Sequence, residues 1–204
     1  MLKVGLTGSI AVGKSFVTEC FRALGCRILD ADKTARDVVE PGTPGLHRIV
    51  KEFGAGVLTD DGRLDRGKLG SIVFADDAKR RLLNSIVHPF VIEAQDAWLQ
   101  AVEIEEPDAI VIVDAALMIE SGGYKRFDKL IVVWCEPALQ FERLMGRDPL
   151  SHEEANKRID AQMPQEEKKG YADYLIDTSG GFEDVRKQVA EIMEELRVFN
   201  TQAC

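Results

Sequence analysis

The stretch from Leu2 to Ser15, LKVGLTGSIAVGKS, decides the fold of this chain. An apolar run at Leu2–Thr7 predicts a strand, residues 8–15 read G-x-x-x-x-G-K-S, and a helical pattern follows at Ser15–Leu24. Glycines let successive backbone N–H groups turn inward around a phosphate, and the N-terminus of the next helix adds partial positive charge. A strand, loop and helix in this order predict a site for a nucleoside triphosphate.

Residues of this glycine-rich loop (Gly8–Ser15) have distinct expected roles. Lys14 is expected to reach the β- and γ-phosphates, and the Ser15 hydroxyl is expected to bind Mg²⁺, the cofactor that accompanies the nucleotide. Because Ala11 carries a Cβ atom, we expect φ to be negative at this position.

Short apolar runs alternate with helical patterns along the rest of the chain. Further strands are expected at Arg27–Asp30, Ile110–Val113, Leu130–Cys135 and Tyr174–Ile176, and a last helix at about 182–199. Continuous apolar strands separated by helices favour an α/β fold, in which helices cover both faces of a parallel sheet.

Two segments interrupt this alternation. Residues of about 33–107 show helical patterns at 46–53, 66–74 and 76–102, and residues of about 140–169 are helical, charged and poor in apolar side chains. We expect both to be substrate-binding or lid elements, the second of them outside the core. In that second segment, Arg143 and Arg147 lie four residues apart on one helix face, with Arg158 further along. The planar forks of arginines suit phosphate oxygens.

Composition narrows the possible partners. The 204 residues include 26 basic and 35 acidic side chains, so a net charge of −9 gives no electrostatic reason to bind nucleic acid or an anionic membrane. The longest apolar run, Leu130–Cys135, is far shorter than the roughly 20 residues of a membrane-spanning helix. The cysteines, which form no CxxC pair, are Cys20, Cys26, Cys135 and Cys204. We expect a soluble, cytoplasmic protein with isolated thiols and without a nucleic-acid or membrane partner.

Carboxylates are expected at the carboxyl edge of the sheet, where parallel sheets bind ligands. Asp114 directly follows Ile110–Val113 and is a candidate second ligand of the metal. Asp30-Ala31-Asp32 ends the second strand, and residues two apart in a strand point to one side, so both carboxylates are expected to face the ligand. Asp32 is then a candidate general base; alternatively, it caps a helix at about 33–39.

The remaining motifs separate the classes of nucleotide-binding protein. A guanine-nucleotide switch needs an Asn-Lys-x-Asp motif, and Asn156–Asp160 is one residue too long and lies in a charged helix. The loop, the paired acids and the arginines instead favour a small-molecule kinase. A kinase of a nucleoside monophosphate or a shikimate-like acid is an alternative, and a nucleotide-binding regulatory module is another.

The order of motifs along nearly the whole chain resembles that of the dephospho-coenzyme A kinase family. The matching residues are Leu6–Ile10 with Gly13–Ser15, Asp30–Asp32 with Ala35-Arg36, Val39–Gly42, Leu64–Arg66 with Leu69 and Val73-Phe74, His88-Pro89, Val113-Asp114, Arg143 with Arg147-Asp148, and Ala172-Asp173 with Ile176. The resemblance implies ATP-dependent phosphorylation of the ribose 3′-hydroxyl of dephospho-coenzyme A, the last step of coenzyme A biosynthesis. ATP and dephospho-coenzyme A are the implied partners, and we expect a monomer or a weak homo-oligomer.

The resemblance also implies a P-loop NTPase-like three-layer fold with a five-stranded parallel sheet. Its nucleotide-binding core comprises about 1–32, 108–139 and 170–204, its helical acceptor-binding insertion about 33–107, and its helical lid about 140–169. The residues implied to be catalytic are Lys14, Asp32 as the general base, and Arg147 as the lid contact to the phosphates. Those implied to bind ATP are Gly8, Ala11, Val12, Gly13, Lys14, Ser15, Phe16, Arg143 and Arg147. Those implied to bind the acceptor are Asp32, Arg36, Asp65, His88 and Asp114, and those for Mg²⁺ are Ser15 and Asp114.

Several positions depart from the family's usual pattern. Ala115-Ala116-Leu117 stands where Pro-Leu-Leu is usual, which we expect to free a turn beside the acceptor. Phe16 stands in place of a threonine, with only a packing change expected, and Ala11 in place of a glycine. Asp177 stands where asparagine is common near the adenine. His88 has an alternative to ligand contact, which is to hydrogen-bond a turn at His-Pro.

Overall fold

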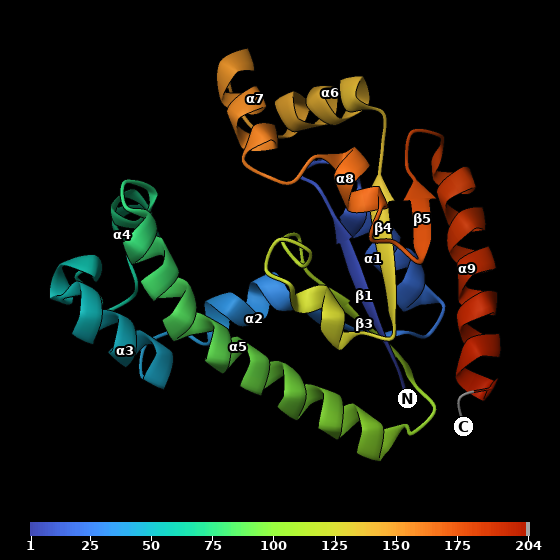
Figure 1. Ribbon diagram of the computed structural model, residues 1–204, viewed down its shortest axis with the longest axis horizontal. Coiled ribbons are helices and arrows are strands. Elements are labelled where there is room, and N and C mark those ends of the chain that lie inside the picture. Colours follow the sequence, from blue (N-terminus) through green and yellow to red (C-terminus); the bar gives the residue numbers. More distant parts are fainter. Residues whose placement is uncertain (203–204) are drawn as a thin grey trace. The chain divides into compact units, whose positions relative to one another are not determined.

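The computed structural model of the chain describes residues 1–202, so Cys204 lies outside the described part. The chain divides into two compact units, one built from residues 1–30 and from residue 102 onward, the other from residues 31–101. Figure 1 shows strands and helices in the first unit and helices in the second.

The first unit is built on five parallel strands in the order β2-β3-β1-β4-β5. Their bounds are Leu2–Gly8 for β1, Arg27–Asp30 for β2, Ile110–Asp114 for β3, Lys129–Trp134 for β4 and Tyr174–Asp177 for β5. The register places Leu6 of β1 opposite Asp114 of β3. The carboxyl ends of β1 and β3 are therefore neighbours, and the loop that follows β1 begins beside Asp114.

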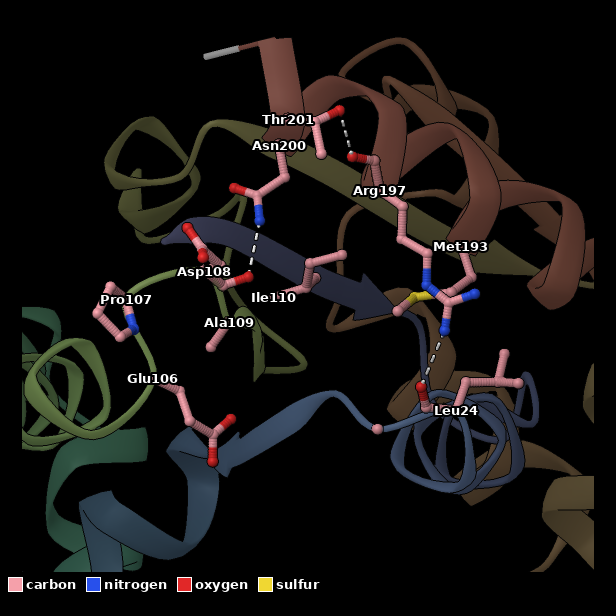
Figure 2. Close-up of a pocket in the computed structure, with 11 residues that line it drawn as sticks. Leu24, Glu106, Pro107, Asp108, Ala109, Ile110, Met193, Arg197, Asn200 and Thr201 are labelled. Atoms are coloured by element: carbon pink, nitrogen blue, oxygen red, sulfur yellow. Dashed lines mark hydrogen bonds between the residues drawn. The ribbon is translucent and has the colours of Figure 1, made fainter. Parts of the chain in front are cut away.

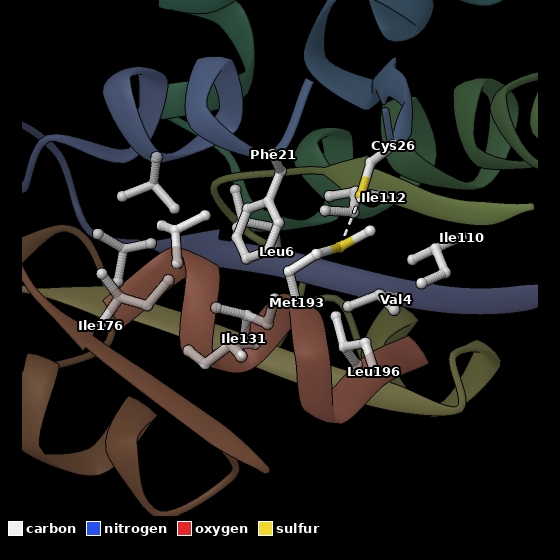
Figure 3. Packing of buried hydrophobic residues seen from close by; sticks show 14 of the residues in the cluster. Val4, Leu6, Phe21, Cys26, Ile110, Ile112, Ile131, Ile176, Met193 and Leu196 are labelled. Atoms are coloured by element: carbon white, nitrogen blue, oxygen red, sulfur yellow. Dashed lines mark hydrogen bonds between the residues drawn. The ribbon is translucent and has the colours of Figure 1, made fainter. Parts of the chain in front are cut away.

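Two helices, α1 (Lys14–Ala23) and α9 (Phe182–Gln202), bury their apolar sides against one face of the sheet. Figure 3 shows Phe21 of α1 and Met193 of α9 packed in one cluster with Leu6 of β1. The central strand is thus enclosed by apolar side chains immediately before the loop begins, and this gives the loop a rigid base.

The other face of the sheet is covered, within this unit, by the segment that follows β3. Gly5 points to this face because it alternates with Val4 and Leu6, and a Cβ atom on it would lie 2.6 Å from Met118 Sδ. A larger side chain at Gly5 would displace this segment. The remaining helices of the unit are η2 (Gly123–Arg126), α6 (Pro137–Arg147), α7 (His152–Asp160) and α8 (Gln165–Lys169).

The second unit is helical. Its elements are α2 (Ala31–Asp37), α3 (Pro44–Phe53), η1 (Ala55–Val57), α4 (Arg66–Phe74) and α5 (Asp77–Glu105), whose last residues belong to the first unit. Its own apolar core contains Val39, Ile49, Val57, Leu69 and Ile86. The Thr43 hydroxyl caps α3 by accepting from the Leu46 N–H at 3.2 Å, so the sequence marks where this helix begins.

The predicted α/β fold with five parallel strands is confirmed. Each strand differs from its predicted range by at most one residue at either end. Within residues 1–202, no helix combines the length and the apolar character that crossing a membrane requires. Cys20, Cys26 and Cys135 are free thiols.

Two local predictions are wrong. Helix α2 begins at Ala31, directly after β2 ends at Asp30, so Asp30 and Asp32 do not share a strand and the argument from alternation fails. Asp32 is the second residue of α2 rather than its cap. His88-Pro89 lies inside α5 and not in a turn, and Pro89 has no N–H to continue the helical ladder.

The prediction that residues 140–169 stay outside the core is also wrong. Leu144 of α6 and Ala155 of α7 are fully buried, and Lys168 of α8 is 1% exposed. These residues are too few to give the segment an apolar composition, but they anchor it in the packing of the first unit.

Candidate active site at the glycine-rich loop

The glycine-rich loop joins β1 to α1 at the carboxyl edge of the sheet. Gly8 lies so close to β4 that a Cβ atom on it would be 2.6 Å from the Val133 carbonyl oxygen. Gly13 precedes α1 with φ at 85°, a left-handed conformation that favours glycine. No side chain in the described part of the chain caps this end of α1, so the N–H groups of its first turn are suited to an anion.

Ala11 has a φ of 60°, which corrects the expectation of a negative value. It is the one non-glycine residue with positive φ within residues 1–202. A Cβ atom in the left-handed region costs about 1–2 kcal/mol. The contacts around the loop must therefore hold this conformation.

Lys14 and Asp114 form an ion pair at the carboxyl ends of the two central strands. The Lys14 ammonium donates to Asp114 Oδ1, and the Thr18 hydroxyl donates to Asp114 Oδ2 at 2.8 Å. The Lys14 and Asp114 side chains are only 17% and 11% exposed. The structure thus brings together the loop lysine and the strand carboxylate that the sequence singles out, and adds Thr18 to them.

Ser15 and Asp114 offer oxygen donors of the kind that Mg²⁺ prefers. In nucleotide sites this ion takes one or two protein oxygens, and phosphates and water complete its coordination. Residues 1–202 contain no group of three or more His, Cys, Asp or Glu suited to a metal. The donor set therefore fits an ion that is bound mainly through the phosphates.

A second set of side chains reaches the loop from β5 and α6. The Thr178 hydroxyl, directly after β5, donates to the Val12 carbonyl at 2.6 Å. Arg143 of α6 donates to Thr178 Oγ1 at 2.9 Å and to the Thr178 carbonyl at 2.7 Å. A Cβ atom on Gly13 would lie 3.5 Å from Arg143 Nη1. The structure therefore holds the Arg143 guanidinium beside the loop.

Sequence reasoning missed Thr178. A signal was available, because Thr178 directly follows β5 at the same edge of the sheet as Asp114. A lone threonine after a strand is nevertheless too common to mark a site without the contact to Val12 that the fold creates.

Arg147 has a different partner in the structure. It donates through Nε and Nη2 to the Asp148 carboxylate at 3.0 and 3.1 Å, and Arg158 donates to Asp148 Oδ2 at 2.8 Å. The hydrogen bonds from Arg147 lower the pKa of Asp148, and those bonds raise the pKa of Arg147. The two arginines thus share one carboxylate, and the contact of Arg147 with the phosphates stays a prediction.

The segment after β3 is fixed by hydrogen bonds. The Ala115 N–H donates to the Leu6 carbonyl at 3.0 Å, a bond that proline has no hydrogen to make. The Ala116 carbonyl accepts from the Thr7 hydroxyl at 3.2 Å and from the Lys168 ammonium at 3.1 Å. These hydrogen bonds restrain the turn in the absence of a proline ring, and the expected effect of the two alanines on the acceptor side stays a prediction.

The predicted acceptor-binding residues Asp32, Arg36, Asp65 and His88 lie in the second unit. Asp32 and Arg36 are exposed on α2, and His88 is exposed on α5. Asp65 caps α4 by accepting from the Lys68 N–H at 2.9 Å, and this hydrogen bond lowers the pKa of Asp65. Asp65 therefore has a structural task, and the acceptor-binding roles of all four residues stay predictions.

The two other positions that depart from the family's pattern have local partners. Phe16 packs against the apolar core, with its ring centroid 4.7 Å from that of Phe182. Asp177 Oδ1 accepts from the Ser179 N–H at 2.8 Å and so shapes the turn after β5. Phe16 thus has the packing role expected of it, and the Asp177 side chain stabilises the backbone turn after β5.

A hollow of about 850 Å³ lies at the opposite, amino edge of the sheet. Figure 2 shows two of its polar side chains bound to the backbone: Asn200 donates to the Asp108 carbonyl at 2.8 Å, and Arg197 donates to the Leu24 carbonyl at 3.4 Å. Because parallel sheets bind ligands at their carboxyl edge, the hollow is not the candidate active site.

Comparisons with known proteins identify the family of the chain. The dephospho-CoA kinase (CoaE) family model matches residues 2–184. A protein of Thermobifida fusca named dephospho-CoA kinase is 46% identical over 198 residues, which cover 97% of each chain. The solved structure of dephospho-CoA kinase from Campylobacter jejuni has a TM-score of 0.72 and 31% identity, covering 97% of this chain and 98% of that one. The structure of TT1252 from Thermus thermophilus has a TM-score of 0.82 and 31% identity, covering 96% of this chain and 97% of that one. The chain therefore belongs to the dephospho-CoA kinase family.

Proposed function

We propose that this chain transfers the γ-phosphoryl group of ATP to the ribose 3′-hydroxyl of dephospho-coenzyme A, which gives coenzyme A and ADP. One observation carries the proposal: in a chain of this family, Lys14 is paired with Asp114 at the carboxyl edge of a parallel sheet. This arrangement is suited to holding a triphosphate and to stabilising the charge that develops during transfer.

The nucleotide side of the reaction is assigned to the first unit. The N–H groups of the glycine-rich loop and of the first turn of α1 bind phosphate oxygens, and Lys14 neutralises charge on the β- and γ-phosphates. Arg143, held by its two hydrogen bonds to Thr178, adds a cation beside Gly13. Arg147 releases the Asp148 carboxylate and donates its hydrogen bonds to the oxygens of the transferred phosphoryl group instead. Ser15 and Asp114 would hold Mg²⁺ through their oxygens, and the ion would supply further charge neutralisation at the phosphates.

We assign Asp32 as the general base on the acceptor side. It is an exposed carboxylate in the first turn of α2, directly after the carboxyl end of β2. The ribose 3′-oxygen forms its bond to the γ-phosphorus while the bond to the β–γ bridging oxygen breaks, and that electron pair leaves with ADP. The proton of the 3′-hydroxyl passes to the Asp32 carboxylate.

Acceptor dependence tests this function. ADP release from MgATP is measured in parallel with dephospho-coenzyme A, AMP, shikimate and no acceptor. We expect strong stimulation by dephospho-coenzyme A alone. Equal or stronger stimulation by AMP or shikimate would assign the chain to another acceptor class. ATP binding without acceptor-dependent ADP release would favour a regulatory module.

The variant Asp32→Asn tests the assignment of the base. Its kcat should fall at least about tenfold while ATP affinity stays within about twofold of the wild type. Asp37→Asn is the matched control, because it removes an exposed carboxylate from the other end of the same helix. Wild-type turnover in Asp32→Asn would remove this residue from the role.

A further inference from the structure

The peptide groups of Ile10, the third residue of the glycine-rich loop, are held by two glutamines. The Ile10 N–H donates to Gln162 Oε1 at 2.7 Å, and Gln140 Nε2 donates to the Ile10 carbonyl at 2.9 Å. Gln140 lies in α6, and Gln162 lies between α7 and α8. Both glutamines belong to the segment of about 140–169, which the sequence predicts as a lid.

Two further hydrogen bonds fix the orientation of the Gln140 side chain. Gln165 Nε2 donates to Gln140 Oε1 at 2.8 Å, and the Cys135 N–H, just past β4, donates to Gln165 Oε1 at 3.1 Å. Gln140 is 2% exposed, so water does not compete for these bonds. A continuous set of hydrogen bonds therefore joins the end of β4, through two side chains of this segment, to the loop.

The two glutamines hold the loop directly before a residue in an unfavourable backbone conformation. Ile10 directly precedes Ala11, whose φ of 60° is unfavourable for a residue with a Cβ atom. Ser9, on the other side of Ile10, has a buried hydroxyl with no hydrogen-bond partner in the part of the chain that the structure describes. The Ser9 side chain thus gives the loop no hydrogen bond within the described residues, whereas the two glutamines hold Ile10, the residue directly before Ala11.

The bond from Ile10 also decides which loop groups face a phosphate. The N–H groups of such a loop ordinarily converge on an anion. Because the Ile10 N–H is directed to Gln162, the N–H groups that follow it are the ones left to bind the triphosphate. A change at Gln162 would release the Ile10 peptide group and alter the direction of the N–H groups that follow it in the loop.

We propose that Gln162 and Gln140 are positioning residues that couple the predicted lid segment to the phosphate-binding conformation of the glycine-rich loop. MgATP binds tightly only when Gln140 and Gln162 both hold Ile10. This inference rests on the nucleotide half of the proposed function and is independent of the acceptor.

The variants Gln162→Met and Gln140→Met test the coupling, because methionine keeps the length of the side chain and removes its polar atoms. Direct titration with MgATP should show binding about tenfold weaker in each variant. The KM for dephospho-coenzyme A should stay within about twofold of the wild type. Because both glutamines act on one loop residue, the double variant should bind MgATP no more than about twofold more weakly than the weaker single variant.

A matched control is Asn200→Leu. Asn200 is also a buried amide that holds a backbone group, donating to the Asp108 carbonyl at 2.8 Å, but it does so at the amino edge of the sheet, away from the loop. Its unfolding midpoint should fall, as that of Gln162→Met does, with MgATP affinity retained. MgATP affinity unchanged in Gln162→Met, or weakened equally in Asn200→Leu, would overturn the proposal. Because MgATP binding is measured without an acceptor, failure of dephospho-coenzyme A as the substrate would leave this result intact.

Discussion

Lys14 and Asp114 are paired across two neighbouring strands of the sheet, the lysine one loop beyond the end of β1 and the aspartate at the end of β3. The parallel register that places Leu6 opposite Asp114 brings the carboxylate to the loop. The pair therefore depends on the β1–β3 register as well as on the two residues.

We expect Asp114→Asn to lower turnover at least about tenfold, because the Lys14 ammonium loses its charged partner and the metal loses an oxygen ligand of full charge. The measurement is the kcat for ADP release at saturating MgATP and acceptor. Asp128→Asn is the control, since the Asp128 carboxylate accepts from the Lys3 N–H at 2.8 Å in an exposed place of the same unit. Equal turnover in the two variants would contradict the role of Asp114.

Replacing Ala11 by glycine should stabilise the protein. Relief of the left-handed conformation contributes about 1–2 kcal/mol, and the larger freedom of glycine in the unfolded chain offsets about 0.5–1 kcal/mol of it. We therefore expect a net gain of up to about 1.5 kcal/mol and a midpoint of thermal unfolding higher by up to about 6 °C. Ala11→Val, with a branched Cβ at the same φ, should shift the midpoint downward. A lower midpoint for Ala11→Gly would show that φ is not strained here.

The ion pair between the buried Lys168 and the more exposed Glu120 should respond asymmetrically to mutation. The Lys168 ammonium lies 2.9 Å from Glu120 Oε1, and their side chains are 1% and 24% exposed. Glu120→Gln leaves a buried cation without a counter-charge and should cost about 3 kcal/mol of unfolding free energy. Lys168→Met leaves a carboxylate that water can reach, so it should cost less, about 1 kcal/mol. Urea unfolding measures both, and the reverse order would contradict the burial of the charge on Lys168.

Cys26 should make the protein less stable in alkali. Burial raises the pKa of this thiol from its ordinary value of 9.0 to about 11, and its Sγ lies 3.5 Å from Met193 Sδ. Because the folded pKa is the higher one, the unfolded chain loses its proton first, and stability falls as pH rises from 9.0 toward about 11. The loss is on the order of 2 kcal/mol.

The measurement is the unfolding free energy of the wild type and of Cys26→Ala across this pH range. The comparison separates the effect of the Cys26 thiol from that of other groups that titrate there. The wild type should lose more stability than the variant as pH rises. Parallel curves for the two proteins would show that the Cys26 thiol does not titrate as its burial requires.

The sheet was predictable because β3 and β4 contain continuous apolar runs separated by helical patterns, and the loop was predictable because its motif is local in sequence. Thr178 and Gln162 were not predictable. Each acts on the loop through one hydrogen bond to its backbone, from more than a hundred residues away, and such a bond leaves no periodic pattern in the sequence. Only the fold shows that these side chains meet the loop.

The remaining errors concern the residues at which a strand or a helix begins or ends. Asp30 and Asp32 read as one strand end, but the helix begins between them at Ala31, and a change from strand to helix changes which side chains share a direction. The helical pattern over 76–102 predicted α5 correctly through Pro89, and only the alternative of a turn at His88-Pro89 is wrong, because a helix of 29 residues has enough other bonds to continue past one missing N–H.

The most direct test of the account is to identify the phosphorylated product. MgATP and dephospho-coenzyme A are incubated with the protein, and the product is examined by phosphorus NMR and mass spectrometry. We expect one added phosphoryl group, a monoester at the ribose 3′-position, with one ADP formed for each product molecule. Phosphorylation at any other hydroxyl, or ADP formed without a phosphorylated acceptor, would contradict it.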